Sequence, residues 1–256
     1  MKPFHGPKLK VRRAEYHISD LRTRIDTFLA RDPYRIELAE NPETGKPAWF
    51  VRITEDLSDD IPLVVGDAVH NLRSALDLLA CDLVRLIPGK SDKGVAFPFA
   101  NSEKKLKDEI KSRNIRRAGP DVVDRIERLK PYKGGCDALW AIHDLDITDK
   151  HKLILPTVFL GGIPNVATTF ASGTTITFQD CFICPVYDGL KINFLAPFPD
   201  SNVGTKLPAR FDVAFGEVEI FQSKAVVPTL RRLATLVHSI IAEFETDTIF
   251  LKCPHS

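Results

Sequence analysis

Short polar side chains recur at intervals of three or four residues between Asp67 and Cys81. At 100° per residue these positions share one face of a helix. Imidazoles and carboxylates can transfer protons or bind metal ions, so this face could carry either chemistry. If water covers it, the same groups form ordinary pairs that contribute about 0.2–0.5 kcal/mol each. The side chains in question are Asp67, His70, Ser74, Asp77 and Cys81.

Reactive side chains concentrate again near the end of the segment 137–151, whose apolar residues recur at helical spacing. They are His143, Asp144, Asp146, Asp149, Lys150 and His151. Both groups are rich in short functional side chains, so we expect the two helices to meet. The expected contacts join His70, Arg73 or Asp77 to Asp149 or His151. The candidate catalytic residues are His70, Arg73, Asp77, Lys150 and His151.

Positive charge gathers between residues 104 and 117, although the formal net charge of the chain is only +1. The overall charge argues against a generally basic surface and leaves room for a local patch that could bind RNA or DNA. Acidic residues are interspersed and no aromatic side chains alternate with the basic ones, which is also typical of a solvated helix. The candidate nucleic-acid-binding residues are Lys104, Lys105, Lys107, Lys111, Arg113, Arg116 and Arg117.

A metal-dependent hydrolase is an alternative interpretation of the same histidines and aspartates. Imidazole and carboxylate ligands together suit zinc, manganese or iron. The chain has no His-Glu-x-x-His motif, so spacing alone supports this alternative, and the main prediction includes no metal site. The ligand set in the alternative is His70, Asp77, His143 and Asp149.

The five cysteines predict reduced thiols, because they are odd in number and scattered. Cys181 and Cys184 have the spacing of a zinc or redox pair, but they lie in a β-prone run where such positions point to opposite faces. No Gly-x-Ser-x-Gly elbow, Walker lysine or dinucleotide fingerprint occurs. The sequence therefore identifies no cofactor and does not decide whether the protein is an enzyme.

These residues need a mainly helical framework. The central element is a long helix over 61–86, with Pro62 in its first turn and Pro88-Gly89 at its end. Further helices are predicted over 8–30, 103–113, 120–129 and 137–151. A β-hairpin is predicted near 34–54, a β-rich part over about 153–222, and a closing helix over about 225–245.

The predicted fold class is α+β, with a helical core packed against an antiparallel meander of five or six strands. We expect residues 1–256 to form a single domain whose helical part covers about 1–152, because no linker or repeat separates the parts. With 44% hydrophobic and 27% charged residues, the composition is that of a soluble globular protein. No apolar run approaches the ~20 residues that cross a bilayer, and residues 1–10 lack the apolar core of a targeting signal. We expect a cytoplasmic protein without a membrane partner.

Four sequence blocks resemble a family of uncharacterised bacterial proteins that carries them in the same order. They are Gly66–Asp77, Phe97-Pro98, Pro131-Tyr132 and Asp149–Lys152. More distantly, a helical core with His-Asn on one helix and Asp-Lys-His on another is similar to the HEPN superfamily of RNA-cleaving and nucleotide-binding domains. That resemblance implies RNA or a nucleotide as the partner. The Arg-x4-6-His motif of HEPN nucleases is absent from both of these helices, and Arg12 and His17 match it on the first helix.

Three hypotheses follow from these patterns. The first is a HEPN-like protein that interacts with nucleic acid or nucleotides through the candidate catalytic residues and the basic segment. The second is the metal-dependent hydrolase. The third is a non-enzymatic module, homo-oligomeric or ligand-binding, in which the same polar residues form a structural network.

Overall fold

A computed structural model describes residues 2–154, 156–162, 166–169, 175–178, 184–185, 206–207, 210–216, 221 and 224–252. The chain divides into two compact units. Unit 1 comprises Met1–Leu21, Pro62–Ile154 and Val227–Ser256, and unit 2 comprises Arg22–Ile61 and Leu155–Val226. The expectation that all 256 residues fold as one interdependent domain concerns cooperativity and stays a prediction.

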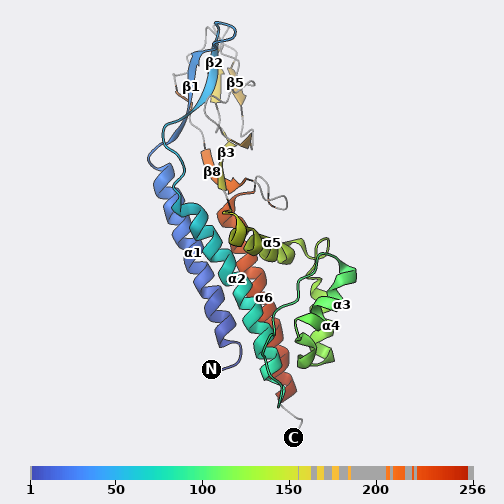
Figure 1. The fold of residues 1–256 in the computed structure, drawn as a ribbon. Coiled ribbons are helices and arrows are strands. Elements are labelled where there is room, and N and C mark those ends of the chain that lie inside the picture. The colour runs from blue at the N-terminus through green and yellow to red at the C-terminus, as the bar shows by residue number, and fades with distance from the viewer. Residues whose placement is uncertain are drawn as a thin grey trace. The chain divides into compact units, whose positions relative to one another are not determined.

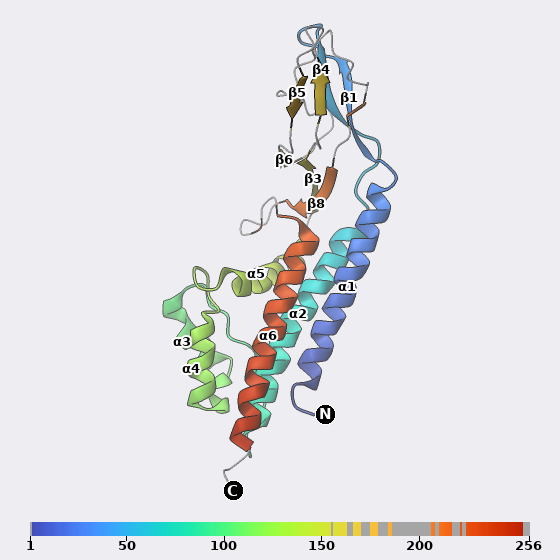
Figure 2. The ribbon, with the colours of Figure 1, turned by 180° about the vertical axis from the view of Figure 1, so that it is seen from behind.

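Three long helices, α1 (His5–Leu29), α2 (Asp60–Arg85) and α6 (Val226–Lys252), provide the framework of unit 1, in which they lie side by side (Figures 1 and 2). Residues 22–29 of α1 belong to unit 2. The predicted central helix is confirmed, because α2 is continuous and its apolar stripe is buried. The buried leucines are Leu72, Leu76, Leu79 and Leu83.

Shorter helices complete unit 1: α3 (Glu103–Ser112), the 3-10 turn η1 (Ile115–Ala118), α4 (Pro120–Leu129) and α5 (Asp137–His151). The bounds of α4 and α5 agree with the predicted ones. For α4 the signals are local, because a proline occupies the first helical position and Lys130, just after the helix, has a left-handed backbone. The closing helix was predicted to end near 245. It continues to Lys252, so that prediction was too short.

An extended segment over 95–100 connects α2 to the helices that follow it. Ala100 forms a parallel bridge with Tyr132. The Ala100 N–H donates to the Pro131 carbonyl at 3.1 Å, and the Lys133 N–H donates to the Ala100 carbonyl at 3.1 Å. Phe97 is fully buried. The Phe97-Pro98 and Pro131-Tyr132 blocks of the sequence therefore lie beside each other.

In unit 2, β1 (Tyr34–Glu40) and β2 (Pro47–Ile53) form the predicted antiparallel hairpin, with Tyr34 opposite Ile53 and Glu40 opposite Pro47. Asn41 closes its turn, because its side-chain oxygen accepts the Glu43 N–H at 2.9 Å. The strand β7 (Lys206–Leu207) pairs with the other edge of β1. This pairing joins segments far apart in the sequence.

The other described strands are β3 (Pro156–Gly162), β4 (Val166–Thr169), β5 (Thr175–Phe178), β6 (Cys184–Pro185) and β8 (Arg210–Phe215). They form two further antiparallel sheets, β6-β3-β8 and β4-β5. The prediction of one sheet of five or six strands was therefore wrong for the described residues, because β4 and β5 pair only with each other there. Cys181 lies outside the described residues, so the predicted orientation of Cys181 and Cys184 on opposite faces stays a prediction.

The fold class is α+β, with a helical core and small antiparallel sheets, as predicted. Cys81 and Cys136 are free thiols. Among the described residues, no helix is both long and apolar enough to span a membrane.

Candidate functional site

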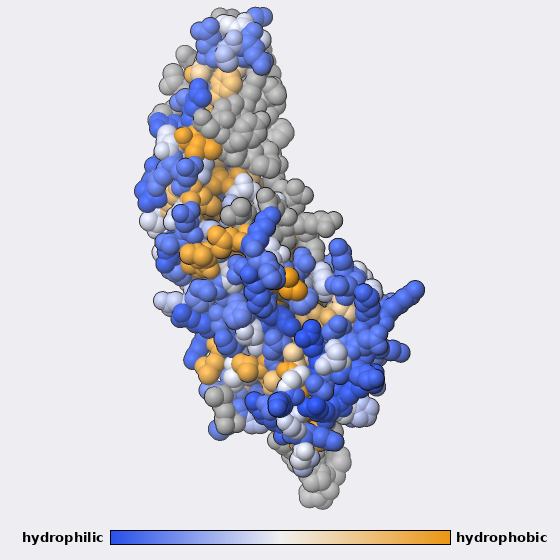
Figure 3. Space-filling model, in the orientation of Figure 1, coloured by the Kyte–Doolittle hydropathy of each residue, from blue (hydrophilic) through white to orange (hydrophobic). Residues whose placement is uncertain are grey.

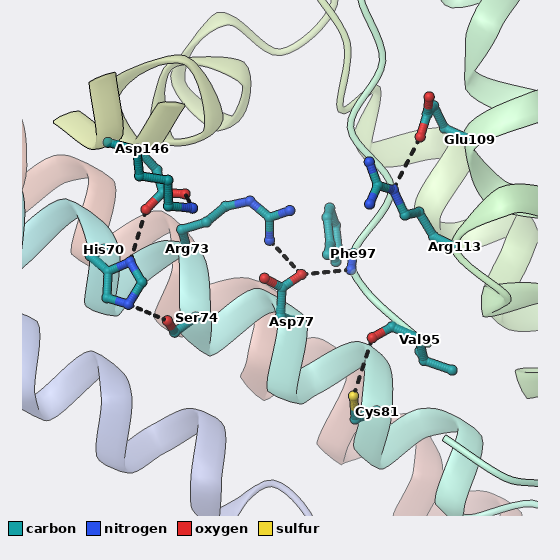
Figure 4. A network of polar contacts seen from close by, with 11 residues as sticks. His70, Arg73, Ser74, Asp77, Cys81, Val95, Phe97, Glu109, Arg113 and Asp146 are labelled. Carbon is teal, nitrogen blue, oxygen red and sulfur yellow. Dashed lines mark hydrogen bonds and ion pairs between the residues drawn. The ribbon is translucent and has the colours of Figure 1, made fainter. Parts of the chain in front are cut away.

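The polar face of α2 has two parts that differ in what covers them (Figure 4). Toward the N-terminal end of the face, His70 and Ser74 lie beside α5. In the second part, Arg73 and Asp77 face the extended segment that contains Phe97. Both parts lie within unit 1.

The first part is centred on Asp146, a carboxylate of α5 whose side chain is only 4% exposed. Its Oδ1 lies 3.0 Å from His70 Nδ1, and its Oδ2 accepts from Lys150 Nζ at 2.5 Å. An ionised carboxylate can only accept hydrogen bonds, so the His70 proton is assigned to Nδ1. The imidazole and the ammonium are 53% and 55% exposed, so one buried anion holds two solvent-facing groups in place.

The remaining ring nitrogen of His70, Nε2, lies 3.4 Å from Ser74 Oγ, which comes from the next turn of α2. Serine, histidine and carboxylate thus follow the order of a hydrolytic triad. Acyl transfer also needs N–H donors for the developing oxyanion. Ser74 lies in the interior of a helix, where backbone N–H groups are already bonded within the helix. The chemistry that this arrangement supports is proton transfer at His70 Nε2 and charge neutralisation by Lys150.

The second part is an ion pair that is mostly covered. Arg73 Nη1 lies 2.5 Å from Asp77 Oδ1, and the arginine side chain is only 11% exposed. The same carboxylate oxygen accepts the Phe97 N–H at 2.9 Å. The Arg73 guanidinium carbon lies 4.6 Å from the centroid of the Phe99 ring, and its Nε is buried without a hydrogen-bond partner. These contacts fix the extended segment onto α2 and leave Arg73 little access to a ligand.

His143 belongs to the same covered region. Its ring stacks on Phe99 with the centroids 4.7 Å apart and an interplanar angle of 4°. Its Nδ1 is buried and has no hydrogen-bond partner. Burial, with the nearby Arg73 charge as the second cause, lowers the pKa of His143 to about 4. The ring is therefore neutral at pH 7.

Asp149 packs against Gly66, where a β-carbon would lie 2.4 Å from either carboxylate oxygen. Burial, followed by the neighbouring Asp146 charge, raises the pKa of Asp149. The two helices meet as expected, but the residue of α5 that bonds to His70 is Asp146 in place of the expected Asp149 or His151. His151 is exposed at the end of α5.

The alternative metal ligands occupy four different environments. Within the part of the chain that the structure describes, no group of three or more His, Cys, Asp or Glu side chains is placed to bind a metal ion. His70 bonds to Asp146, Asp77 to Arg73, His143 stacks on Phe99, and Asp149 packs against Gly66.

The basic segment covers α3 and η1, where the surface is strongly hydrophilic (Figure 3). Its four lysines are exposed: Lys104, Lys105, Lys107 and Lys111. The arginines have structural partners. Arg113 pairs with Glu109 at 3.2 Å, Arg116 donates to the Lys107 carbonyl at 3.4 Å, and Arg117 donates to the Ser91 and Lys93 carbonyls at 2.9 and 3.0 Å. The lysines are therefore the groups free to contact a polyanion.

The Arg12 and His17 pair of α1 does not form a shared exposed site. Arg12 is exposed, whereas His17 is 8% exposed. Burial, with Arg13 as the second cause, lowers the pKa of His17. His17 Nδ1 lies 3.9 Å from Asp67 Oδ2, so the first residue of the polar face of α2 is directed toward α1.

Asp146 is the functional residue that the sequence interpretation did not single out. The sequence signal for Asp146 was an aspartate at a position on the apolar side of the helix. Leu139 and Ile142 precede it at helical spacing on the buried side of α5. Lys150 follows one turn later, the spacing of an intrahelical ion pair. A buried carboxylate with a cation one turn away indicates that the carboxylate holds the cation in a fixed position.

No protein-family model, curated protein or solved structure matches this chain.

Proposed function

We propose that this protein binds phosphate groups of RNA or of a nucleotide at His70 and Lys150. The observation that carries the proposal is the buried Asp146 carboxylate, which holds an imidazole and an ammonium that both face solvent. A phosphate oxygen accepts a charge-assisted hydrogen bond from an ammonium, and from an imidazole when both of its ring nitrogens carry protons. The Ser74 hydroxyl beside the imidazole adds a further donor.

The same residues could support cleavage of RNA. His70 Nε2 would accept the proton of a ribose 2′-hydroxyl, whose oxygen attacks the adjacent phosphorus while the bond to the 5′-oxygen breaks. The leaving oxygen takes a proton from an acid or from water, and Lys150 neutralises charge on the phosphate. In this proposal Arg73 and Asp77 are positioning residues, because they hold the extended segment against α2.

The exposed lysines of α3 would add contacts to a longer polyanion. Lys104, Lys107 and Lys111 follow one another at helical spacing and share a face. Each phosphate that they neutralise would make binding more sensitive to salt. A cytoplasmic location, which the free Cys81 and Cys136 thiols support, would place the site among RNA and nucleotides.

The test is fluorescence anisotropy with a labelled single-stranded RNA at low and at physiological salt. Alanine at His70 or Lys150 should each weaken binding by about tenfold, the value of one charge-assisted contact. His238→Ala and Lys46→Ala, at exposed positions elsewhere, are the matched controls. Absence of binding by the wild-type chain, or equal binding by all four variants, would refute the proposal.

Cleavage is tested separately with RNA and with DNA of the same sequence. Only the RNA has the attacking 2′-hydroxyl, so only the RNA should yield products, and these should carry a cyclic phosphate. Binding without cleavage would leave a phosphate-binding protein and exclude the nuclease. Cleavage of both polymers would contradict the role assigned to His70.

A further inference from the structure

A groove of about 910 Å³ lies in unit 1, between the first turns of α1 and the second half of α2. This volume is in the range of about 300–1,000 Å³ that small-molecule sites occupy. Figure 3 shows apolar surface among hydrophilic surface in this part of the molecule. His70 and Lys150 do not line the groove, so it is separate from the proposed phosphate site.

Cross-helix contacts hold the groove in shape. Phe4, just before α1, is buried and has a φ of 63°, and its N–H donates to Asp82 Oδ2 at 2.9 Å. At the other end, Lys10 Nζ donates to Asn71 Oδ1 at 3.2 Å. Asn71 is itself fixed, because its amide donates to the Asp67 carbonyl at 2.8 Å. The two helices are therefore tied together on both sides of the hollow.

The floor of the groove is apolar. Leu9, Leu78 and Leu86 line it and are each partly exposed. Gly6 and Pro7 also line it, and Gly6 has no side chain to fill the space. These three leucines remain partly exposed to water. An apolar ligand that covers them would remove this surface from water, and the burial would favour binding.

The charges around the groove are mainly positive. Arg85 pairs with Asp82 at 2.9 Å and with Asp92, so its charge is compensated. Lys10 and Arg13 line the opposite end, and the described part of the chain provides no carboxylate partner for either. Lys10 retains further N–H donors beyond its bond to the Asn71 amide. This end of the groove is therefore suited to a negatively charged group.

We infer that the groove binds a small anionic amphiphile, with its carboxylate or other acidic head at Lys10 and Arg13 and its apolar body over Leu9, Leu78 and Leu86. A small ligand fits better than a protein partner, because the hollow has the volume of a small-molecule site and lysine, which lines it, is depleted at protein interfaces. The size of the hollow, its apolar floor and its charged end point to the same ligand class.

The experiment is isothermal titration of the full chain with decanoate, and with decylammonium as a probe of the same length and opposite charge. Decanoate should bind saturably with one site per chain, whereas decylammonium should not. The Lys10→Glu, Arg13→Glu double variant should weaken decanoate binding by at least about tenfold. Leu78→Trp should also abolish it, because the larger ring fills the hollow.

The matched control is Arg12→Glu, which reverses one charge at an exposed position of the same helix outside the groove. It should leave decanoate affinity unchanged, and thermal unfolding should show every variant to be folded. Lack of saturable binding, or equal affinity for decylammonium, would overturn the inference. A dimer in sedimentation that Leu78→Trp dissociates would overturn it too, because the groove would then be an interface between copies of the chain.

Discussion

The polar face of α2 carries similar residues in two different states. His70 and Ser74 lie beside α5 and remain open to solvent, whereas Arg73 and Asp77 are covered by the segment that contains Phe97 and Phe99. Polar side chains of one helix thus serve as accessible groups in one part and as structural anchors in the other. What distinguishes them is the segment that covers them, since both parts belong to one regular helix. The following predictions test this difference.

A substitution on the opposite, apolar face of α2 should cause the largest loss of stability in this comparison. Leu76 is fully buried, so Leu76→Ala should lower the free energy of unfolding by about 2–5 kcal/mol through lost burial and a new cavity. Urea denaturation measures this loss. A loss below about 0.5 kcal/mol would contradict the orientation of the helix.

Asp77→Ala should be the most damaging change on the polar face. It leaves the mostly buried Arg73 without its counter-ion and the Phe97 N–H without its acceptor. We expect a loss of about 2–3 kcal/mol in the free energy of unfolding. Asp77→Asn keeps an acceptor for Phe97 and should lose less. Equal stability of the two variants would show that the Phe97 hydrogen bond contributes nothing, and wild-type stability of both would show that neither contact matters.

Gly66→Ala tests the close approach of α5 to α2. The added carbon would lie 2.4 Å from the Asp149 carboxylate oxygens, so the variant should lose about 1–3 kcal/mol of unfolding free energy. Asp149→Ala removes the clash. In a double-mutant cycle the two changes should therefore be strongly non-additive. Simple additivity in urea denaturation would argue against this packing.

The pH dependence of stability should reveal His143. Its pKa is lowered from the ordinary 6.5 to about 4 in the folded state, so the unfolded chain binds more protons between these values. The stability that the neutral ring provides is present above about pH 6.5 and is lost as the pH falls toward 4. His143→Phe keeps a ring to stack on Phe99 and should lose less stability than the wild type over this range. Parallel unfolding curves for the two proteins would contradict the prediction.

His70→Ala should have the smallest effect on stability, about 0–1 kcal/mol, because the pair with Asp146 is half exposed and Lys150 still compensates the carboxylate. The same substitution should weaken phosphate binding. A large loss of stability would mean that the two parts of the polar face are alike, and that His70 is an anchor as well.

Local signals allowed much of the helical framework to be predicted. The leucine periodicity of α2 and the proline at the start of α4 act within a few residues, so they are visible in the sequence. The β1–β7 pairing is not visible in this way, because Lys206 and Leu207 lie far along the chain from β1. Short strands of this kind are specified by tertiary contacts.

The candidate site shows the same limit. The sequence identified His70, Lys150 and the helices that carry them. It did not identify Asp146 as their shared partner, because that depends on how α5 is rotated against α2. It also did not show that Arg73 and Asp77 would be covered, since the covering residues Phe97 and Phe99 belong to a segment without regular periodicity.

The position of α6 beside α1 and α2 has a consequence for biosynthesis. Lys8, at the start of α1, pairs with Glu245 of α6 at 2.5 Å, so unit 1 joins segments that leave the ribosome at very different times. α1 and α2 can form early, but the apolar side chains that α6 covers stay open while the residues of unit 2 are translated. Such delayed, long-range closure is slow and prone to aggregation. Nascent chains halted before Val226 should therefore be the forms of this protein that depend most on chaperones.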